Sequence, residues 1–317
     1  MEALQYSGNL DCTPIFSSII RGKAVNTLRA YKTGFSKWKI FAESNNLIVF
    51  PVNKIEFTLF LINWVEDGGS WPSLRNAICS VKFYMDFFSF EFNIPSQSHI
   101  EQYLRKNARK VNNKKRPLLK SEIDKIYYTC KDDISVQNYR NLCILLFGFF
   151  GFLRFDDLSQ IRLKDVTVIG NVISIVLYDA KNDYNKEGQN VRIKCSEGWL
   201  VIFKTYLKIS GMVNYMCNDD YFLFPAMKDG ALCSKKKIGY KEVRSCILNL
   251  CSRSGVDAKN IGSHSLRIGG CTEATRRGIP DHILDIHGRW ALNSRARSGY
   301  QRLIEEDFCW VSEVLMN

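Results

Sequence analysis

Apolar residues recur at helical spacing through the first hundred residues of the chain. The stretch NTLRAYKTGFSKWKIFAESN carries its large apolar side chains three or four positions apart, at Leu28, Tyr31, Phe35, Trp38 and Phe41. This spacing places them on one face of a helix, where we expect them to form a core. Two more helices are predicted, from about Ile55 to Val65 and from Pro72 onward.

A long apolar run marks the middle of the chain. It extends over residues 142–153, which is well short of the ~20 residues needed to cross a bilayer. We therefore predict a buried helix from Asn138 to about Phe152. Before it, Lys120 opens another predicted helix, for which Ser121 is the expected N-cap.

Alternating β-branched residues follow this helix. The stretches 166–169 and 172–178 flank Gly170-Asn171 and predict a hairpin, and a third strand is expected near 191–193. Helices are expected from Ser196 to the C-terminus. The predicted fold class is therefore mainly α with a small antiparallel β-sheet, in which a helical domain precedes a mixed α/β domain.

The positive charge is concentrated in one short segment. The chain has 44 lysines and arginines against 32 aspartates and glutamates, a net charge of +12. The segment 105–120 contains no acidic residue and eight basic ones: Arg105, Lys106, Arg109, Lys110, Lys114, Lys115, Arg116 and Lys120. We predict a basic linker between domains 1–104 and 121–317, whose first seven cations lie against a phosphate backbone. A solvated linker and a nuclear address are the alternatives.

Composition excludes several classes of protein. Apolar residues make up 46% and charged residues 24%, which is typical of a globular chain and excludes disordered and fibrous classes. The stretch MEALQYSGNLDCTP shows no secretory signal, so we expect a soluble intracellular protein. The eleven cysteines include no C-x-x-C pair, which favours reduced core thiols over disulfides or a zinc site.

Two segments place arginines where chemistry is expected. GFLRFDDLSQIRL has Arg154 directly after an apolar helix and Asp157 three residues later. SHSLRIGGCTEATRRG has His264 and Arg267 on one helical face, behind a capping Ser263. Each segment also has a structural interpretation, an Arg154–Asp157 ion pair in the first and a helix-capping histidine in the second. The glycine pair 269–270 indicates close helix packing rather than a phosphate loop.

A third segment, HGRWALNSRARSGYQRL, contains His287, Trp290 and Tyr300. Together the three segments resemble the tyrosine recombinase (phage-integrase) family over about residues 20–300. The setting G-L-R-x-x-E/D-L matches residues 151–158, the H-x-x-R box matches His264 and Arg267, and G-[HW] matches Trp290 in preference to His287. The HSLRIGGCT and HGRW segments look like those of the Crypton-like branch of eukaryotic mobile elements.

The resemblance implies a catalytic set and a reaction. The implied catalytic residues are Arg154, Lys181, His264, Arg267, Trp290 and Tyr300. Asp157 would orient Arg154 or His264, and Lys186 is the alternative to Lys181. Two guanidinium groups suit the charge that develops on a phosphodiester, and a nearby positive field helps a tyrosine to attack. Such an enzyme cleaves and rejoins DNA through a 3′-phosphotyrosine, without metal, nucleotide or other cofactor.

The resemblance also implies partners and a place in the cell. We expect double-stranded DNA as substrate, a dimer at each site, a tetrameric synapse, and nuclear residence in a eukaryotic host. The expected process is site-specific recombination or transposition of a mobile element. A relaxing enzyme of the type IB topoisomerase kind and a DNA-binding protein that no longer cuts are the alternatives. The terminal stretch EEDFCWVSEVLMN is a predicted amphipathic helix that packs on its own domain or on a neighbouring subunit.

Overall fold

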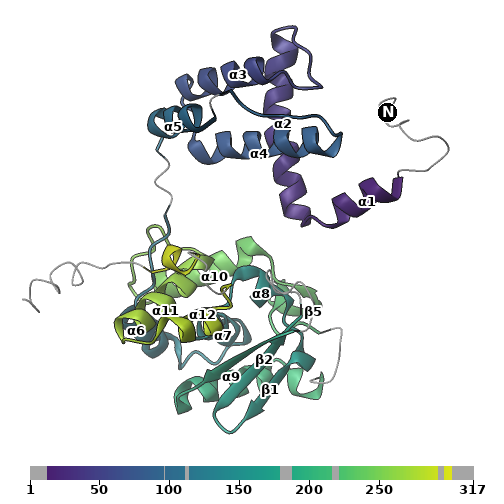
Figure 1. Cartoon of the computed structure of the whole chain (residues 1–317). Helices are drawn as coiled ribbons and strands as arrows, with labels where there is room; N and C mark the ends of the chain where they lie inside the picture. The colour runs from purple at the N-terminus through teal and green to yellow at the C-terminus, as the bar shows by residue number, and fades with distance from the viewer. Residues whose placement is uncertain are drawn as a thin grey trace, which may run out of the picture. The chain divides into compact units, whose positions relative to one another are not determined.

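Figure 1 shows a computed structural model of the chain, which describes residues 13–95, 97–110, 114–178, 188–215, 221–291 and 296–301. The chain divides into two compact units, Met1–Asn112 and Asn113–Asn317. This boundary falls inside the segment 105–120 that the charge pattern marks as a linker. No helix in the described ranges is both long enough and apolar enough to span a membrane.

The described part of the first unit is helical. Its helices are α1 (Thr13–Arg21), α2 (Val25–Ser44), α3 (Lys54–Glu66), α4 (Trp71–Phe87) and α5 (Gln97–Asn107). The predictions of α2, α3 and α4 are confirmed. The aromatic face of α2 forms the core as predicted, because Trp38 is fully buried and lies edge-on to Phe57 and Phe60.

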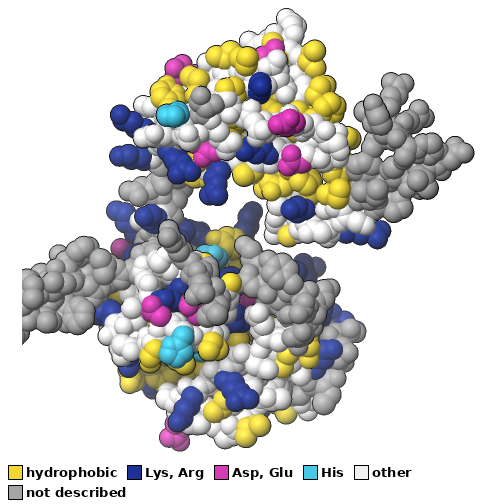
Figure 2. Space-filling model, viewed as in Figure 1, with side chains coloured by type: hydrophobic (Ala, Val, Ile, Leu, Met, Phe, Trp, Pro, Cys, Tyr) yellow, Lys and Arg dark blue, Asp and Glu magenta, His cyan; other side chains and the backbone are white. Residues whose placement is uncertain are grey.

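Helix α5 continues further than the charge pattern indicates. It ends at Asn107, so Arg105 and Lys106 lie in its last turn and not in an extended linker. The helix is anchored by Leu104, which is fully buried in the core of the first unit. Figure 2 shows lysine and arginine side chains gathered on and beside α5.

The helices of the second unit surround a buried central helix. They are α6 (Lys120–Cys130), α7 (Val136–Phe150), α8 (Phe155–Gln160), α9 (Glu197–Ile209), α10 (Tyr240–Arg253), α11 (Ser263–Arg276) and α12 (Asp281–Gly288), with short 3₁₀ turns η2 (Leu163–Asp165), η3 (Met212–Tyr215) and η4 (Arg297–Gly299). Helix α7 is the predicted apolar helix, and residues 138–149 of it are all buried. It forms the centre of the main core, against which α9, α10 and α11 pack.

Two antiparallel sheets complete the second unit. The first has the order β1 (Val166–Ile169), β2 (Val172–Leu177) and β3 (Gln189–Lys194), which confirms the predicted hairpin and third strand. The second sheet, β4 (Pro225–Lys228) with β5 (Ala231–Lys237), contradicts the expectation of helices throughout this region. Its turn is Asp229-Gly230, both at positive φ, a dipeptide that favours tight hairpins. The mainly helical fold class with antiparallel sheet is confirmed.

Both predicted serine caps are wrong. Helix α6 begins at Lys120, two residues earlier than a cap at Ser121 allows, and Glu122 Oε2 accepts from the backbone N–H of Leu119 at 2.9 Å. Ser263 is the first residue of α11 and not its cap, because Ser265 Oγ accepts from the N–H of Gly262 at 3.0 Å. In each case a side chain three residues inside the helix reaches back and replaces the expected cap.

Candidate active site

Arg154 is positioned by the sharp end of the central helix. After α7, Phe152 adopts a left-handed backbone conformation (φ 51°), and Arg154 then precedes the first turn of α8. The backbone N–H of Arg154 donates to Asp157 Oδ2 at 2.9 Å. The side chain of Arg154 is half-buried, and its guanidinium makes no hydrogen bond or ion pair within the described ranges. Its donors therefore remain available to an incoming anion.

Asp157 pairs with a different arginine from the one expected. Its Oδ2 lies 2.6 Å from Nη2 of Arg289, and both side chains are almost completely buried, at 5% and 4% exposure. The alternative interpretation of this segment, an Arg154–Asp157 ion pair, is thus wrong, and Asp157 instead accepts the backbone N–H of Arg154. The pair joins the start of α8 to the end of α12, because Arg289 is the left-handed residue (φ 55°) that ends α12.

Helix α11 carries His264 and Arg267 into the site. Its glycine pair permits very close packing, because a Cβ on Gly269 would lie 1.9 Å from the carbonyl oxygen of Leu118 and one on Gly270 would lie 2.1 Å from that of Phe149. The prediction that these glycines serve helix packing is confirmed. They set the depth at which Arg267 enters the protein.

Arg267 is completely buried, and no carboxylate within the described ranges forms an ion pair with it. Nη1 donates to the carbonyl of Phe152, Nη2 donates to that of Gly288 at 2.5 Å, and Nε has no acceptor in the described part of the chain. The guanidinium carbon lies 4.2 Å from the ring centroid of Trp290 and 4.8 Å from that of Tyr300. Burial and the positive charges of Arg154 and Arg289 lower the pKa of Arg267 to about 9.

Trp290 folds back over the glycine that precedes it by two positions. A Cβ on Gly288 would lie 1.9 Å from the indole ring, so only glycine leaves room for this arrangement. The indole is buried, and its N–H has no acceptor in the described residues. His287, the alternative to Trp290, instead contacts the carbonyl of Phe150 at 2.8 Å through Nε2. The geometry therefore favours Trp290 over His287.

Tyr300 lies close to Arg267, Trp290 and His264. Its ring centroid is 5.4 Å from that of Trp290 and 6.3 Å from that of His264. The turn before it, η4, is held by Arg297, whose Nε and Nη2 lie 2.8 Å from Asp285 and 2.7 Å from Asp281 of α12. Thr272 of α11 donates its hydroxyl to the carbonyl of Tyr300 at 3.3 Å. These contacts fix the tyrosine against its own chain's arginines.

His264 lies at the mouth of the site. Partial burial of the ring, and then the charges of Arg267 and Arg154, lower its pKa below the usual 6.5, although Asp156 opposes them. The imidazole is therefore neutral at physiological pH. A neutral imidazole beside a tyrosine can accept its phenolic proton.

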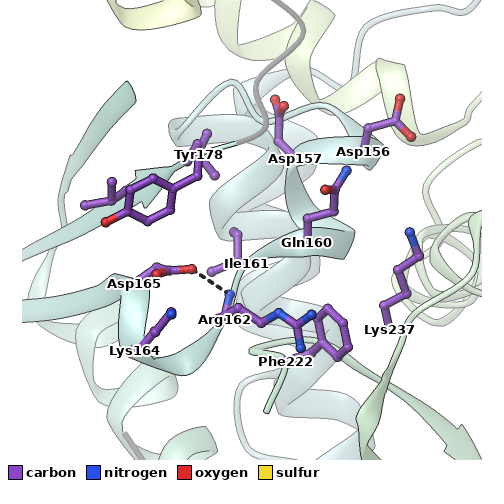
Figure 3. A pocket seen from close by; sticks show the side chains of 12 residues that line it. Asp156, Asp157, Gln160, Ile161, Arg162, Lys164, Asp165, Tyr178, Phe222 and Lys237 are labelled. Atoms are coloured by element: carbon purple, nitrogen blue, oxygen red, sulfur yellow. Dashed lines mark hydrogen bonds between the residues drawn. The ribbon is translucent and has the colours of Figure 1, made fainter. Parts of the chain in front are cut away.

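The predicted catalytic lysine lies outside the described residues. Lys181 and Lys186 both belong to the segment that follows Tyr178, the last described residue after β2. Tyr178 borders a pocket (Figure 3) with Asp156 and Asp157 at one side and Lys237 of β5 at another. In this pocket the Arg162 guanidinium lies 3.7 Å from the centroid of the Phe222 ring. The assignment of the lysine stays a prediction.

The predicted DNA-binding cations differ in how available they are. Five are exposed: Arg105, Lys106, Arg109, Lys110 and Lys114. Arg116 is instead held in the second unit by Glu122, with the two guanidinium–carboxylate contacts at 2.9 and 3.0 Å. Lys115 is half-buried and lines a pocket with His264 and Tyr300. The charge pattern therefore grouped together residues that have different surroundings.

Sequence reasoning missed Arg289, Arg297 and Lys115 as members of this neighbourhood. Arg289 lies inside the HGRW motif, so the motif itself contained a signal for it. No local pattern pointed to Arg297 or Lys115. Within the described ranges, no three His, Cys, Asp or Glu side chains lie close enough together to hold a metal ion.

Comparison with known proteins identifies the class. The model of the phage integrase family matches residues 116–303, more than half of the chain. The chain therefore belongs to the phage integrase family, the tyrosine recombinases. A search of curated proteins found no match.

Solved structures resemble this one over nearly its whole length. A XerH site-specific recombinase bound to palindromic difH substrate matches with a TM-score of 0.66 and 16% identity, covering 94% of this chain and 82% of that one. The Tn1549 transposon integrase in complex with transposon right end DNA gives 0.59 and 17%, covering 95% and 98%. A lambda integrase dimer bound to a COC′ core site gives 0.55 and 13%, covering 91% and 75%. At sequence identities this low, the likeness shows a shared fold and nothing beyond it.

Proposed function

We propose that this protein cleaves and rejoins DNA strands through a 3′-phosphotyrosine formed by Tyr300. One observation carries the proposal: Arg154, His264, Arg267, Trp290 and Tyr300 come from four separate parts of the second unit and meet in one site. Two of these groups, Arg154 and Arg267, are guanidiniums that pair with no carboxylate of the described residues, which suits a site for a phosphodiester.

The reaction follows from the chemistry of these groups. The phenolic oxygen of Tyr300 attacks the scissile phosphorus while the neutral imidazole of His264 accepts its proton. Arg154, Arg267 and the unpaired indole N–H of Trp290 donate to the non-bridging oxygens, whose charge grows in the transition state. The 5′ oxygen leaves, and Lys181, or Lys186 in its place, supplies its proton. The phosphotyrosine bond conserves the energy of the phosphodiester, so rejoining requires neither metal nor nucleotide.

The proposed process is site-specific recombination or transposition of a mobile element. Structural neighbours include a site-specific recombinase and a transposon integrase, which supports this process over simple relaxation of supercoils. The HSLRIGGCT and HGRW segments support a Crypton-like origin, from which nuclear residence follows. A type IB topoisomerase-like enzyme and a DNA-binding protein that no longer cuts are the competing functions.

We also propose that the protein works as a dimer on each site and as a tetramer in the synapse. An apolar pocket on the second unit is lined by Phe149, Phe150, Phe152, Ala274, Ile283 and Leu284. Two isoleucines that line it, Ile279 and Ile283, are 40% and 46% exposed. The segment 302–317, whose apolar residues recur at helical spacing, lies outside the described residues and is the expected occupant, from the same or a neighbouring subunit.

A covalent-trapping assay tests the cleavage. Full-length protein is mixed with a library of nicked duplexes that contain candidate element termini, denatured in SDS, and scored for DNA that migrates with protein. We expect an adduct with the wild type and none with Tyr300→Phe. An adduct that survives in the variant would move the nucleophile to another tyrosine. Specific binding without any adduct would favour the protein that no longer cuts.

The same duplex distinguishes recombination from relaxation. A supercoiled plasmid that carries two copies of the trapped site should yield recombinant products, and a plasmid with one copy should not. Cleavage should require more than one subunit. Relaxation by a monomer, with no exchange between the sites, would favour the topoisomerase-like alternative.

A further inference from the structure

The N-terminus of α11 offers anion-binding groups beside the proposed cleavage site. Helix α11 has fourteen residues and begins at Ser263. The amide N–H groups of Ser263 and His264 have no acceptor in the described part of the chain, whereas Gly262 N–H is taken by Ser265 Oγ. Unpaired amides at a helix start carry partial positive charge and point at a prospective anion.

A buried hydroxyl independently indicates a ligand at the same place. Ser263 is 3% exposed, and its Oγ has no hydrogen-bond partner among the described residues. It lines a pocket at the start of α11. A buried hydroxyl without a partner costs free energy, so its presence is explained if a ligand oxygen accepts its proton.

A lysine supplies charge to this pocket. Lys115 lines it, and its side chain lies along the backbone of Gly262, where an added Cβ would come within 3.3 Å of Cε. Lys115 makes no ion pair within the described ranges. The remaining lining residues include Tyr240, His264 and Tyr300 but no carboxylate. The pocket therefore favours a singly or doubly charged oxyanion over a cation or a neutral ligand.

We propose that this pocket binds a second, non-scissile phosphodiester of the cleaved DNA strand. Ser263 donates through its hydroxyl and amide, His264 donates through its amide, and Lys115 neutralises the charge. This inference rests on the proposed function, because the pocket shares His264 and Tyr300 with the cleavage site. Binding of the second phosphate fixes the register of the strand, so that the scissile phosphate stands opposite Tyr300.

A phosphate-neutralisation scan tests the assignment. The duplex that yields the tyrosine adduct is prepared with a single methylphosphonate at successive linkages around the scissile one, and dissociation constants are measured. We expect Ser263→Ala and Lys115→Gln to weaken binding of the unmodified duplex roughly tenfold each, as loss of a hydrogen bond or contact to a charged group does. At one non-scissile linkage, the methylphosphonate should weaken DNA binding by the wild type. It should not weaken DNA binding by either variant any further.

Two controls make the scan decisive. Lys131→Gln removes an equal charge from a surface lysine paired with Asp132 and should leave binding unchanged. The proposal would be overturned if Ser263→Ala bound every methylphosphonate duplex more weakly than the wild type binds it, by the same factor as for the unmodified duplex. If the wild type forms no adduct at all, the proposed function fails instead, so the two failures are distinguishable.

Thermal melting separates a ligand-binding serine from a structural one. Ser263→Ala removes an unpartnered hydroxyl and should melt at or above the wild-type temperature, whereas Ser265→Ala removes the acceptor for Gly262 and should melt lower. A lower melting temperature for Ser263→Ala would contradict the proposal. Inorganic phosphate offers the same chemistry, so melting is repeated in phosphate buffer. Stabilisation by phosphate that depends on Ser263, without coupling to any DNA linkage, would assign the pocket to free phosphate.

Discussion

Two completely buried arginines of the second unit have opposite surroundings. Arg140 on α7 is 1% exposed, and its Nη1 lies 2.8 Å from Glu242 and 2.7 Å from the carbonyl of Pro225. Arg267 on α11 is equally buried, but among the described residues it contacts carbonyl oxygens and aromatic rings and no carboxylate. A carboxylate neutralises Arg140 inside the fold, whereas no carboxylate in the described ranges pairs with Arg267.

Under the proposed function, this difference distinguishes an arginine that stabilises the fold, Arg140, from one that binds the substrate, Arg267. Burying an unpaired charge is expensive, and the lowered pKa of Arg267, about 9, expresses that cost. Asp157, whose charge acts on Arg267, is paired with Arg289. Among the described residues no carboxylate therefore pairs with Arg267. Under the proposed function, a phosphodiester would supply the negative charge that Glu242 supplies at Arg140.

The largest expected effect separates these two arginines directly. Arg267→Met should slow adduct formation by about 10²–10³-fold, the loss seen when one donor to a developing oxyanion is removed. Its stability should fall by only about 1–2 kcal/mol, because relief of an unpaired charge offsets the lost hydrogen bonds. Adduct formation is followed by SDS gel, and stability by urea unfolding.

The two arginines would not differ in role if Arg140→Met changed stability and cleavage as Arg267→Met does. We expect that variant to lose about 3–5 kcal/mol of stability, because Glu242 is left without its partner. Its cleavage rate per folded molecule should equal that of the wild type. Equal losses of stability in both variants would show that the two arginines serve the fold alike.

The Asp157–Arg289 ion pair provides a third case, a buried arginine that is neutralised by a carboxylate inside the candidate site. Asp157→Asn should destabilise the protein by about 3 kcal/mol, since the buried ion pair between Asp157 and the Arg289 guanidinium is lost. Adding Arg289→Met should restore most of that stability without restoring cleavage, because the tie between α8 and α12 stays broken. Recovery of both properties in the double variant would contradict a positioning effect of the pair.

Arg297 tests whether a carboxylate-paired arginine can affect cleavage through position alone. Arg297→Gln breaks the contacts to Asp281 and Asp285 and frees the turn before Tyr300. We expect roughly tenfold slower adduct formation with unchanged DNA affinity, because misplacing a nucleophile costs rate and not binding. Arg253→Gln, which also breaks two side-chain contacts but at the far end of α10, is the matched control.

The smallest expected effect is a pH dependence caused by His264. Its pKa lies below 6.5, so the imidazole is neutral at pH 7 and the cleavage rate should decline only as the pH falls below 6.5. His264→Gln should be slower and lack this acidic limb. The same shift makes the fold lose stability as the pH falls, because the unfolded chain binds the proton more tightly than the folded one. A midpoint above 6.5 would be inconsistent with these surroundings.

Local spacing explains which parts of the fold were predictable. The helices α2, α3, α4 and α7 follow from apolar residues three or four positions apart, and the β1–β2 hairpin from Gly170-Asn171. The β4–β5 hairpin was missed, although Asp229-Gly230 is a signal of the same kind. The caps were missed because Glu122 and Ser265 reach back three residues and compete with the serines expected to cap.

The sequence by itself determined the local geometry of the candidate site. The H-x-x-R spacing places His264 and Arg267 on one face of α11, and Gly288 leaves room for the indole of Trp290, two positions later, where a Cβ would prevent the contact. These features depend on residues within one or two helical turns of each other. They are therefore visible in a linear pattern.

Only the tertiary structure decided which charges neutralise one another. Asp157 pairs with Arg289, 132 positions away, and not with Arg154 three positions away. Arg116 is bound by Glu122, and Lys115 lies at the site although both belong to one basic run. The strength of an ion pair depends on distance and burial, and both are set by which elements meet in the folded chain. The unpaired charge of Arg267 is thus a property of the packing of α7, α11 and α12 together.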